Sequence, residues 1–246
     1  MSEIDYSGYS SPIREDLVSA HRRAWQRIGE PGTWLSARER ILVAQETRQA
    51  EHCRFCDERA VALSPYAVVG EHDSCTDLSA IRIEAIHTIR RDQSRITDAW
   101  FESLLERGLL MTEYVELTGV IATVMAIDRF CDALGIERHA LPQPQPGEPT
   151  QHIPAGAKPG LARVMTVAPE DVSEAEADLY NGMSGANIHR ALSLVPAEVQ
   201  GFFDLDSAMY LPDAKLRDFD DEPRAISHAQ IEFLAARVSA LNRCYY

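Results

Sequence analysis

Apolar residues recur every three or four positions along most of the 246-residue chain, and this spacing restricts the fold more than any other feature. Side chains at that spacing share one face of a helix, whereas a half-buried strand needs apolar and polar residues to alternate. The periodic segments are rich in Ala, Leu, Glu and Arg, which favour helices. The sequence therefore predicts an all-α fold.

Local signals predict where several helices begin and end. Ser36 and Glu39 have the spacing of a capping box, in which each side chain satisfies a backbone N–H at the start of a helix. Gly135 suits the left-handed residue that follows many helices. The predicted helices cover 36–51, a short segment before Pro65, 78–91, 97–107, 112–134, 187–194, 197–211 and 227–242.

Three of these helices have recognisable faces. In helix 78–91, Ile83, Ile86 and Ile89 are expected to point inward, while Glu84 and His87 lie on an adjoining polar stripe. The buried face predicted for helix 112–134 consists of Tyr114, Leu117, Ile121, Val124, Ile127 and Cys131. The apolar face of the last helix consists of Ile231, Leu234, Val238 and Leu241.

A proline-rich stretch divides the helical pattern. Residues 141–169 contain Pro142, Pro144, Pro146, Pro149, Pro154 and Pro159, each without a backbone donor. This composition indicates a linker or a surface strap. The expected organisation is a helical unit over 1–140, the strap over 141–169 and a second, partial helical unit over 170–246.

An internal repeat favours two tandem units. An offset of 191 residues places 35–55 over 226–246. The aligned pairs are Ser36 with Ser227, Glu39 with Gln230, Ala44 with Ala235, Cys53 with Cys244 and Phe55 with Tyr246. A cap, an apolar face and a cysteine thus coincide, which predicts a duplication whose second copy is incomplete at Tyr246.

The charge balance narrows the classes of ligand. With 24 basic and 38 acidic residues, the formal net charge is −14. This charge repels a phosphate backbone, so binding to nucleic acid or to an anionic membrane is not expected. The most apolar run, 118–127, is about half the roughly 20 residues of a membrane span. The first residues lack the order of a signal peptide, so a cytoplasmic protein is expected.

The sharpest local motif is the pair Cys53 and Cys56, placed between two predicted helices. Two cysteines three residues apart in a first helical turn bring their sulfur atoms close together. The free N–H groups and the helix dipole there favour a thiolate. A thiolate beside a second thiol can reduce a peroxide or exchange disulfides.

A thiol enzyme also needs groups that transfer protons. Glu84 and His87 are one helical turn apart and are the candidates in the first unit. Glu232, twelve residues before Cys244, is the equivalent candidate in the second unit. The alternative for Glu84 and His87 is a solvated helix face.

A metal site competes with thiol chemistry. Cys53 and Cys56 are followed by His72 and Cys75, which gives the order Cys-x2-Cys-x15-His-x2-Cys. Three thiolates and one imidazole satisfy tetrahedral zinc. The alternative prediction is therefore a non-catalytic helical assembly module with structural zinc at these four residues.

Four segments of the chain resemble the alkylhydroperoxidase D-like and carboxymuconolactone decarboxylase-like superfamily. They are CRFC, LTGVIATVMAIDRFCDALGI, NIHRALSLVP and SHAQIEFLAARVSALNRCYY. The last two are most similar to the peroxidase-related subgroup of that superfamily. The resemblance implies all-helical units that assemble as homo-oligomers, either dimers, trimers or hexamers. The apolar surface of helix 112–134 favours such an assembly independently. The peroxidase branch carries Glu-x11-Cys-x2-Cys-x3-His, in which the second cysteine reacts with peroxide, the first resolves it, and Glu and His relay protons.

Neither unit carries the whole motif. In the first unit Cys53 and Cys56 match, but Ile41 and Ala60 stand at the Glu and His positions. In the second, Glu232 and Cys244 match and the remaining positions would lie beyond Tyr246. Three alternatives follow. Cys53 and Cys56 work with Glu84 and His87, the second unit is the active one, or the activity has been lost.

The preferred hypothesis is a thiol peroxidase that reduces organic hydroperoxides through a dithiol–disulfide cycle. It implies a small-molecule peroxide as substrate, no bound cofactor, and a dithiol reductant that is lipoyl or thioredoxin-like. A lyase of the decarboxylase type is a weaker alternative, because no basic cluster is apparent in the sequence to hold a carboxylate substrate.

Overall fold

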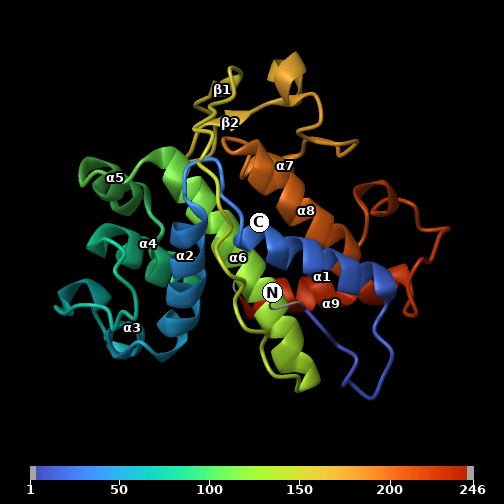
Figure 1. The fold of residues 1–246 in the computed structure, drawn as a ribbon, viewed down its shortest axis with the longest axis horizontal. Helices are drawn as coiled ribbons and strands as arrows, with labels where there is room; N and C mark the ends of the chain where they lie inside the picture. Colours follow the sequence, from blue (N-terminus) through green and yellow to red (C-terminus); the bar gives the residue numbers. More distant parts are fainter. Residues whose placement is uncertain (1–3, 243–246) are drawn as a thin grey trace.

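The computed structural model describes residues 4–242 and is built mainly of helices, as the sequence predicts (Figure 1). The α-helices are α1 (Glu15–Ile28), α2 (Ala37–Gln49), α3 (Arg54–Val61), α4 (Ala80–Arg91), α5 (Asp98–Glu106), α6 (Met111–Leu134), α7 (Asn187–Arg190), α8 (Pro196–Met209) and α9 (His228–Leu241). Short 3-10 helices are η1 (Ala50–His52), η2 (Pro65–Ala67), η3 (Gln93–Arg95), η4 (Pro169–Asp171), η5 (Glu174–Glu176) and η6 (Asp213–Lys215). Strands β1 (Ala157–Lys158) and β2 (Thr166–Val167) pair antiparallel.

Local end signals act as expected. The Ser36 hydroxyl accepts the Glu39 N–H while the Glu39 carboxylate accepts the Ser36 N–H, and Ser227 and Gln230 repeat this box at α9. Gly135 ends α6 in the left-handed conformation with φ of 67°. Two elements differ from the prediction. Helix α7 has four residues, where a helix over 187–194 is predicted, and α1 forms where the sequence predicts no helix.

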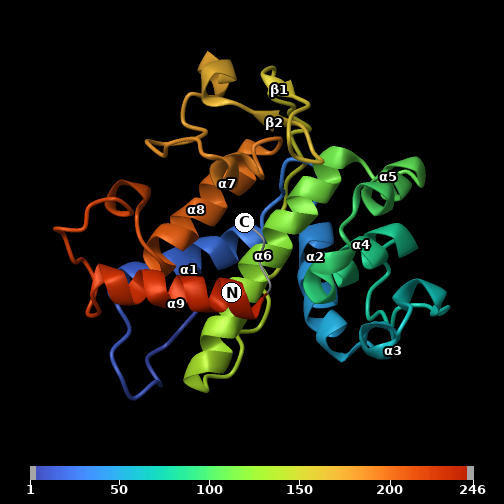
Figure 2. The same cartoon turned by 180° about the vertical axis from the view of Figure 1, so that it is seen from behind.

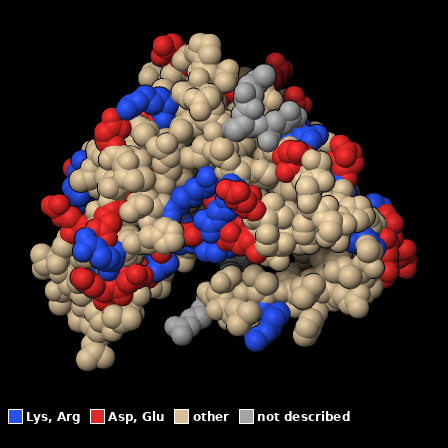
Figure 3. Space-filling view, turned by 60° about the horizontal axis from the view of Figure 1, so that its bottom comes forward, with Lys and Arg blue, Asp and Glu red and all other residues tan. Residues whose placement is uncertain are grey.

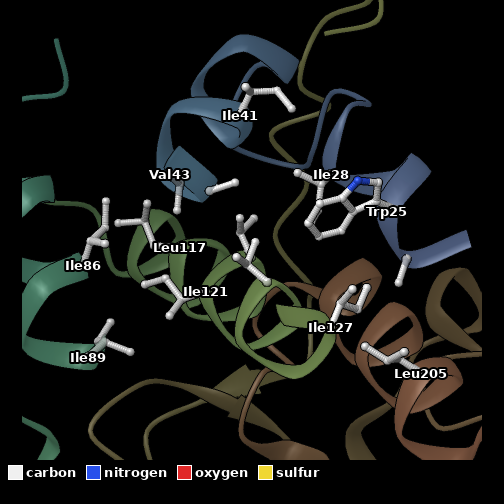
Figure 4. Packing of buried hydrophobic residues seen from close by; sticks show 14 of the residues in the cluster. Trp25, Ile28, Ile41, Val43, Ile86, Ile89, Leu117, Ile121, Ile127 and Leu205 are labelled. Atoms are coloured by element: carbon white, nitrogen blue, oxygen red, sulfur yellow. The ribbon is translucent and has the colours of Figure 1, made fainter. Parts of the chain in front are cut away.

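The main core surrounds α6 (Figure 4). This helix runs through the middle of the fold (Figure 1). Helices α2 and α4 pack on one side of it, and α1 and α8 pack on the other (Figures 1 and 2). The predicted face of α6 is buried except for Tyr114, which is half-buried against Phe101. Because neighbouring helices of the same chain cover α6, its apolar surface gives no independent argument for an oligomer.

The first part of the proline-rich segment is a surface strap over α1, whereas its later part forms β1 and β2. The indole N–H of Trp25 donates to the carbonyl of Ala140 at 2.9 Å, and the N–H of Gln145 donates to the carbonyl of Gly29 at 2.7 Å. Beyond the strap, Leu205 of α8 lies in the same hydrophobic cluster as α1 and α6. The segments before and after the strap therefore share one core.

The apolar face predicted for α9 is mostly open. Ile231 is buried, but Leu234, Val238 and Leu241 are 52, 54 and 63% exposed. Phe233 on the same helix is 70% exposed. Within residues 4–242, the predicted apolar face of α9 is therefore covered only at Ile231.

Surface charge is mixed on the face that Figure 3 shows. On the face in Figure 3, basic and acidic side chains are intermingled rather than separated. Within residues 4–242, no single helix has the length and hydropathy to cross a membrane. Helices α5 and α6 together have that length and hydropathy, but the chain bends by 117° between them.

Candidate functional site

Four side chains that can bind a metal or transfer a proton converge where α2 ends beside α3 and α4 (Figures 1 and 2). Cys53 joins η1 to α3, and Cys56 lies in the first turn of α3. His72 comes from the loop before α4, and His87 comes from α4 itself. One ligand atom from each of the four lies within 4.8 Å of the others. The cluster, called here the Cys/His cluster, consists of these four residues.

Each sulfur faces an imidazole nitrogen. The Cys56 sulfur lies 3.4 Å from Nδ1 of His72 and 3.4 Å from Nδ1 of His87. The Cys53 sulfur lies 3.5 Å from Nδ1 of His72 and accepts the N–H of Asp73 at 3.4 Å. Cys56 is therefore the sulfur that contacts both rings.

A carboxylate orients each imidazole from the far side. Nε2 of His72 lies 2.9 Å from the carboxylate of Glu84, and Nε2 of His87 lies 2.8 Å from that of Glu46. An ionised carboxylate only accepts hydrogen bonds, so each Nε2 is assigned the proton. Both Nδ1 lone pairs then point at the sulfur atoms.

The loop that carries His72 is held on both flanks. Asp73 accepts the Arg54 backbone N–H and pairs with its guanidinium at 2.8 Å. The hydroxyls of Ser74 and Thr76 donate to the Glu46 carboxylate at 2.9 and 2.6 Å. Glu46 thus connects α2, the loop and α4, which makes it the organising residue of the site.

Burial controls the ionisation of the cluster. Burial, followed by the neighbouring Cys53 thiol, raises the pKa of Cys56 to about 12, against the thiolate expected at a helix start. Burial also lowers the pKa of His87, although the Glu46 hydrogen bond opposes this shift. Burial alone would raise the pKa of Glu84, but the His72 hydrogen bond and Arg59 lower it to about 2. Cys56 therefore needs a proton acceptor or a cation to become a thiolate.

The residues predicted as a relay are present, but each has a different partner from the one expected. Glu84 contacts His72, and His87 contacts Glu46. His87 is also fully buried, so it does not lie on a solvated helix face. Two carboxylate–imidazole pairs replace the single pair read from the helix spacing.

The predicted zinc set requires one correction. Cys53, Cys56 and His72 come together, but Cys75 is exposed and His87 takes the fourth position. The hydroxyls flanking Cys75 both bond to Glu46, and this arrangement leaves the thiol at the surface.

The second-unit candidates are separate from the cluster. Glu232 accepts a hydrogen bond from the Tyr210 hydroxyl at 2.6 Å and lies on α9, across α6 from the cluster (Figure 2). Cys244 lies outside the described residues. Cys131 is buried in the main core, as expected for a core thiol.

Glu46 is the site residue that sequence reasoning missed. It lies three residues after Val43 and four before Ala50, on the buried side of α2. An acidic residue at an apolar-face position is rarely buried without a partner. That position was the available signal, although it does not identify His87 as the partner.

Comparisons with known proteins leave the family open. No family model, curated protein or solved structure matches this chain.

Proposed function

We propose that the protein is a thiol-dependent peroxidase that reduces organic hydroperoxides by cycling Cys53 and Cys56 between dithiol and disulfide. The observation that carries this proposal is the pair of carboxylate-backed imidazoles whose Nδ1 atoms face the two sulfurs. Such an imidazole can accept a thiol proton and return it to a leaving group. Because burial raises the pKa of Cys56, the thiol needs such a proton acceptor whenever no cation is bound.

Cys56 is the better candidate for attack on peroxide. Its sulfur contacts both rings, and the residue retains 8% exposure while Cys53 retains none. The Cys56 proton passes to Nδ1 of His87, and Glu46 stabilises the resulting imidazolium. The thiolate attacks one peroxide oxygen, the O–O bond breaks, and His87 protonates the departing alkoxide to give an alcohol. Cys56 is then a sulfenic acid.

Cys53 completes the cycle. Its proton passes to Nδ1 of His72, and its sulfur attacks the sulfur of the Cys56 sulfenic acid. The S–S bond forms as the S–O bond breaks, and the hydroxide takes the proton from His72 and leaves as water. One hydroperoxide and two thiols thus give one alcohol, one water and one disulfide.

The remaining expectations rest on the family resemblance. They are a tandem alkylhydroperoxidase-like architecture, assembly as a homo-oligomer, and regeneration by a lipoyl or thioredoxin-like dithiol. No residue of the Cys/His cluster identifies the reductant.

The test is a single turnover followed by mapping of the thiols. Reduced protein receives one equivalent of cumene hydroperoxide, is quenched, and is analysed by peptide mass spectrometry. We expect a Cys53–Cys56 disulfide, at least a hundredfold slower peroxide loss in Cys56→Ser, and an unchanged rate in Cys75→Ser, whose thiol is exposed and outside the cluster. Equal rates in Cys56→Ser and the unaltered protein would contradict the assignment.

A further inference from the structure

The geometry of the Cys/His cluster matches that of a tetrahedral metal site. Bonds of about 2.3 Å to sulfur and about 2.0–2.1 Å to nitrogen, at a tetrahedral angle, place sulfur and nitrogen about 3.6 Å apart. Three of the four sulfur–nitrogen separations measure 3.4, 3.4 and 3.5 Å, and all four ligand atoms lie within 4.8 Å of one another. One ion at the centre could therefore reach all four ligand atoms with small adjustments.

The atoms behind the ligands also match a metal site. A metal-bound histidine typically donates its other ring N–H to a carboxylate, which orients the ring and strengthens the ligand. Glu84 does this for His72 and Glu46 does it for His87, at 2.9 and 2.8 Å. The backbone N–H of Asp73 adds a hydrogen bond to the Cys53 sulfur.

The ligand types and their burial indicate zinc. Two thiolates and two imidazoles suit zinc and disfavour Mg²⁺ or Ca²⁺, which prefer oxygen. Cys53 and His87 are fully buried, and Cys56 is 8% exposed. With four protein ligands and little solvent access, the site has the closed form of structural zinc. The charge of the two thiolates would neutralise that of the ion.

The surrounding fold gives such an ion a structural role. Cys53, Phe55 and Cys56 form a small hydrophobic cluster, with Val68 packed against it, apart from the main core. The loop between α3 and α4 leaves Leu63 and Val69 almost fully exposed. A metal that joins α3, this loop and α4 would supply stabilisation that so few apolar contacts do not.

We propose that Cys53, Cys56, His72 and His87 bind one zinc ion when both thiols are reduced, and that hydroperoxide oxidation of the pair to a disulfide releases it. In the release step, two zinc-bound thiolates, one hydroperoxide and two protons from solvent give the disulfide, one alcohol, one water and free Zn²⁺. The two sulfur atoms are oxidised by two electrons in total, and these electrons reduce the O–O bond of the hydroperoxide. Release rests on the proposed function, whereas zinc binding does not.

The binding experiment uses the full chain, reduced and purified without chelator. Zinc is measured by elemental analysis and by competition with a chromogenic chelator, and Co²⁺ substitution reports the ligand set through its absorption spectrum. We expect one zinc per chain in the unaltered protein and in Cys75→Ser. His87→Gln and Cys56→Ser should bind at least tenfold more weakly. Circular dichroism of the Co²⁺-free variants checks that they remain helical.

Three results would overturn parts of the proposal. The site is rejected if the unaltered protein does not bind stoichiometric zinc. It is also rejected if Cys75→Ser loses zinc while His87→Gln retains it. If zinc binds but one equivalent of cumene hydroperoxide neither forms the disulfide nor frees zinc, the release step and the proposed function fail while the site stands. If the disulfide forms in protein that never binds zinc, the proposed function stands and the site is rejected.

Discussion

At the scale of single residues, His21 connects stability to pH. Its ring is fully buried, and Nδ1 lies 2.6 Å from the Tyr6 hydroxyl. Burial, with a smaller effect from His139, lowers the pKa of His21 to about 4, against an ordinary value of 6.5. The folded protein therefore keeps this imidazole neutral at pH values where the unfolded chain protonates it.

The pH dependence follows from that difference. Between pH 6.5 and 4 the unfolded chain binds a proton that the folded protein does not, so the free energy of unfolding falls as pH falls through this window. The loss is at most about 3.5 kcal/mol, from about 1.4 kcal/mol per pKa unit over the fall from 6.5 to about 4. Urea unfolding at several pH values measures it.

His21→Gln should reduce that slope, because an amide does not titrate. Tyr6→Phe is the control, since it removes the hydroxyl and keeps the buried imidazole. If His21→Gln and the unaltered protein lose stability in parallel between pH 6.5 and 4, burial of His21 is not the cause.

At the scale of secondary-structure elements, the end of α6 depends on one glycine. Gly135 has φ of 67°, a conformation that costs an L-residue about 1–2 kcal/mol. No atom lies within 4 Å of where its Cβ would be, so a substitution there tests backbone strain alone.

Gly135→Ala should therefore lower the free energy of unfolding by about 1 kcal/mol. Gly8→Ala is the matched control, because its Cβ also enters open space and its φ lies outside the left-handed region. Thermal and urea unfolding of both variants measure the difference in their free energies of unfolding. Equal stability of the two would show that the helix end tolerates a side chain.

At the scale of the whole molecule, a buried ionic network joins both halves of the chain. Arg40 on α2 contacts Glu116 on α6 at 2.5 Å and Glu198 on α8 at 2.8 Å. All three side chains are at most 2% exposed. Removing one partner of such a network leaves buried charge without compensation.

Arg40→Met should destabilise the protein by about 3–5 kcal/mol, because buried Glu116 loses the cation it contacts and Glu198 keeps only the more distant Arg27, at 3.2 Å. Arg38→Met is the control on the same helix. Its ion pair with Asp77 is 66 and 64% exposed, so its loss should cost under about 1 kcal/mol. Comparable urea midpoints for the two variants would contradict a structural role for the network.

Local sequence patterns predicted the elements better than they predicted the site. The boxes at Ser36 and Ser227 place the starts of α2 and α9 correctly, because a cap depends on residues within one turn. Spacing proposed Cys75 as a zinc ligand, since it follows His72 by three residues. The path of the loop instead turns Cys75 to the surface and brings in His87 from α4.

The sequence by itself determined the helical class, most helix ends, the buried face of α6 and the adjacent pair Cys53 and Cys56. Each of these depends on periodicity or on neighbours a few positions away. Only the tertiary structure decided that α2, the loop and α4 bring Glu46, His72 and His87 around that pair. Convergence over such sequence separations depends on how helices pack across the shared core, which local patterns do not encode.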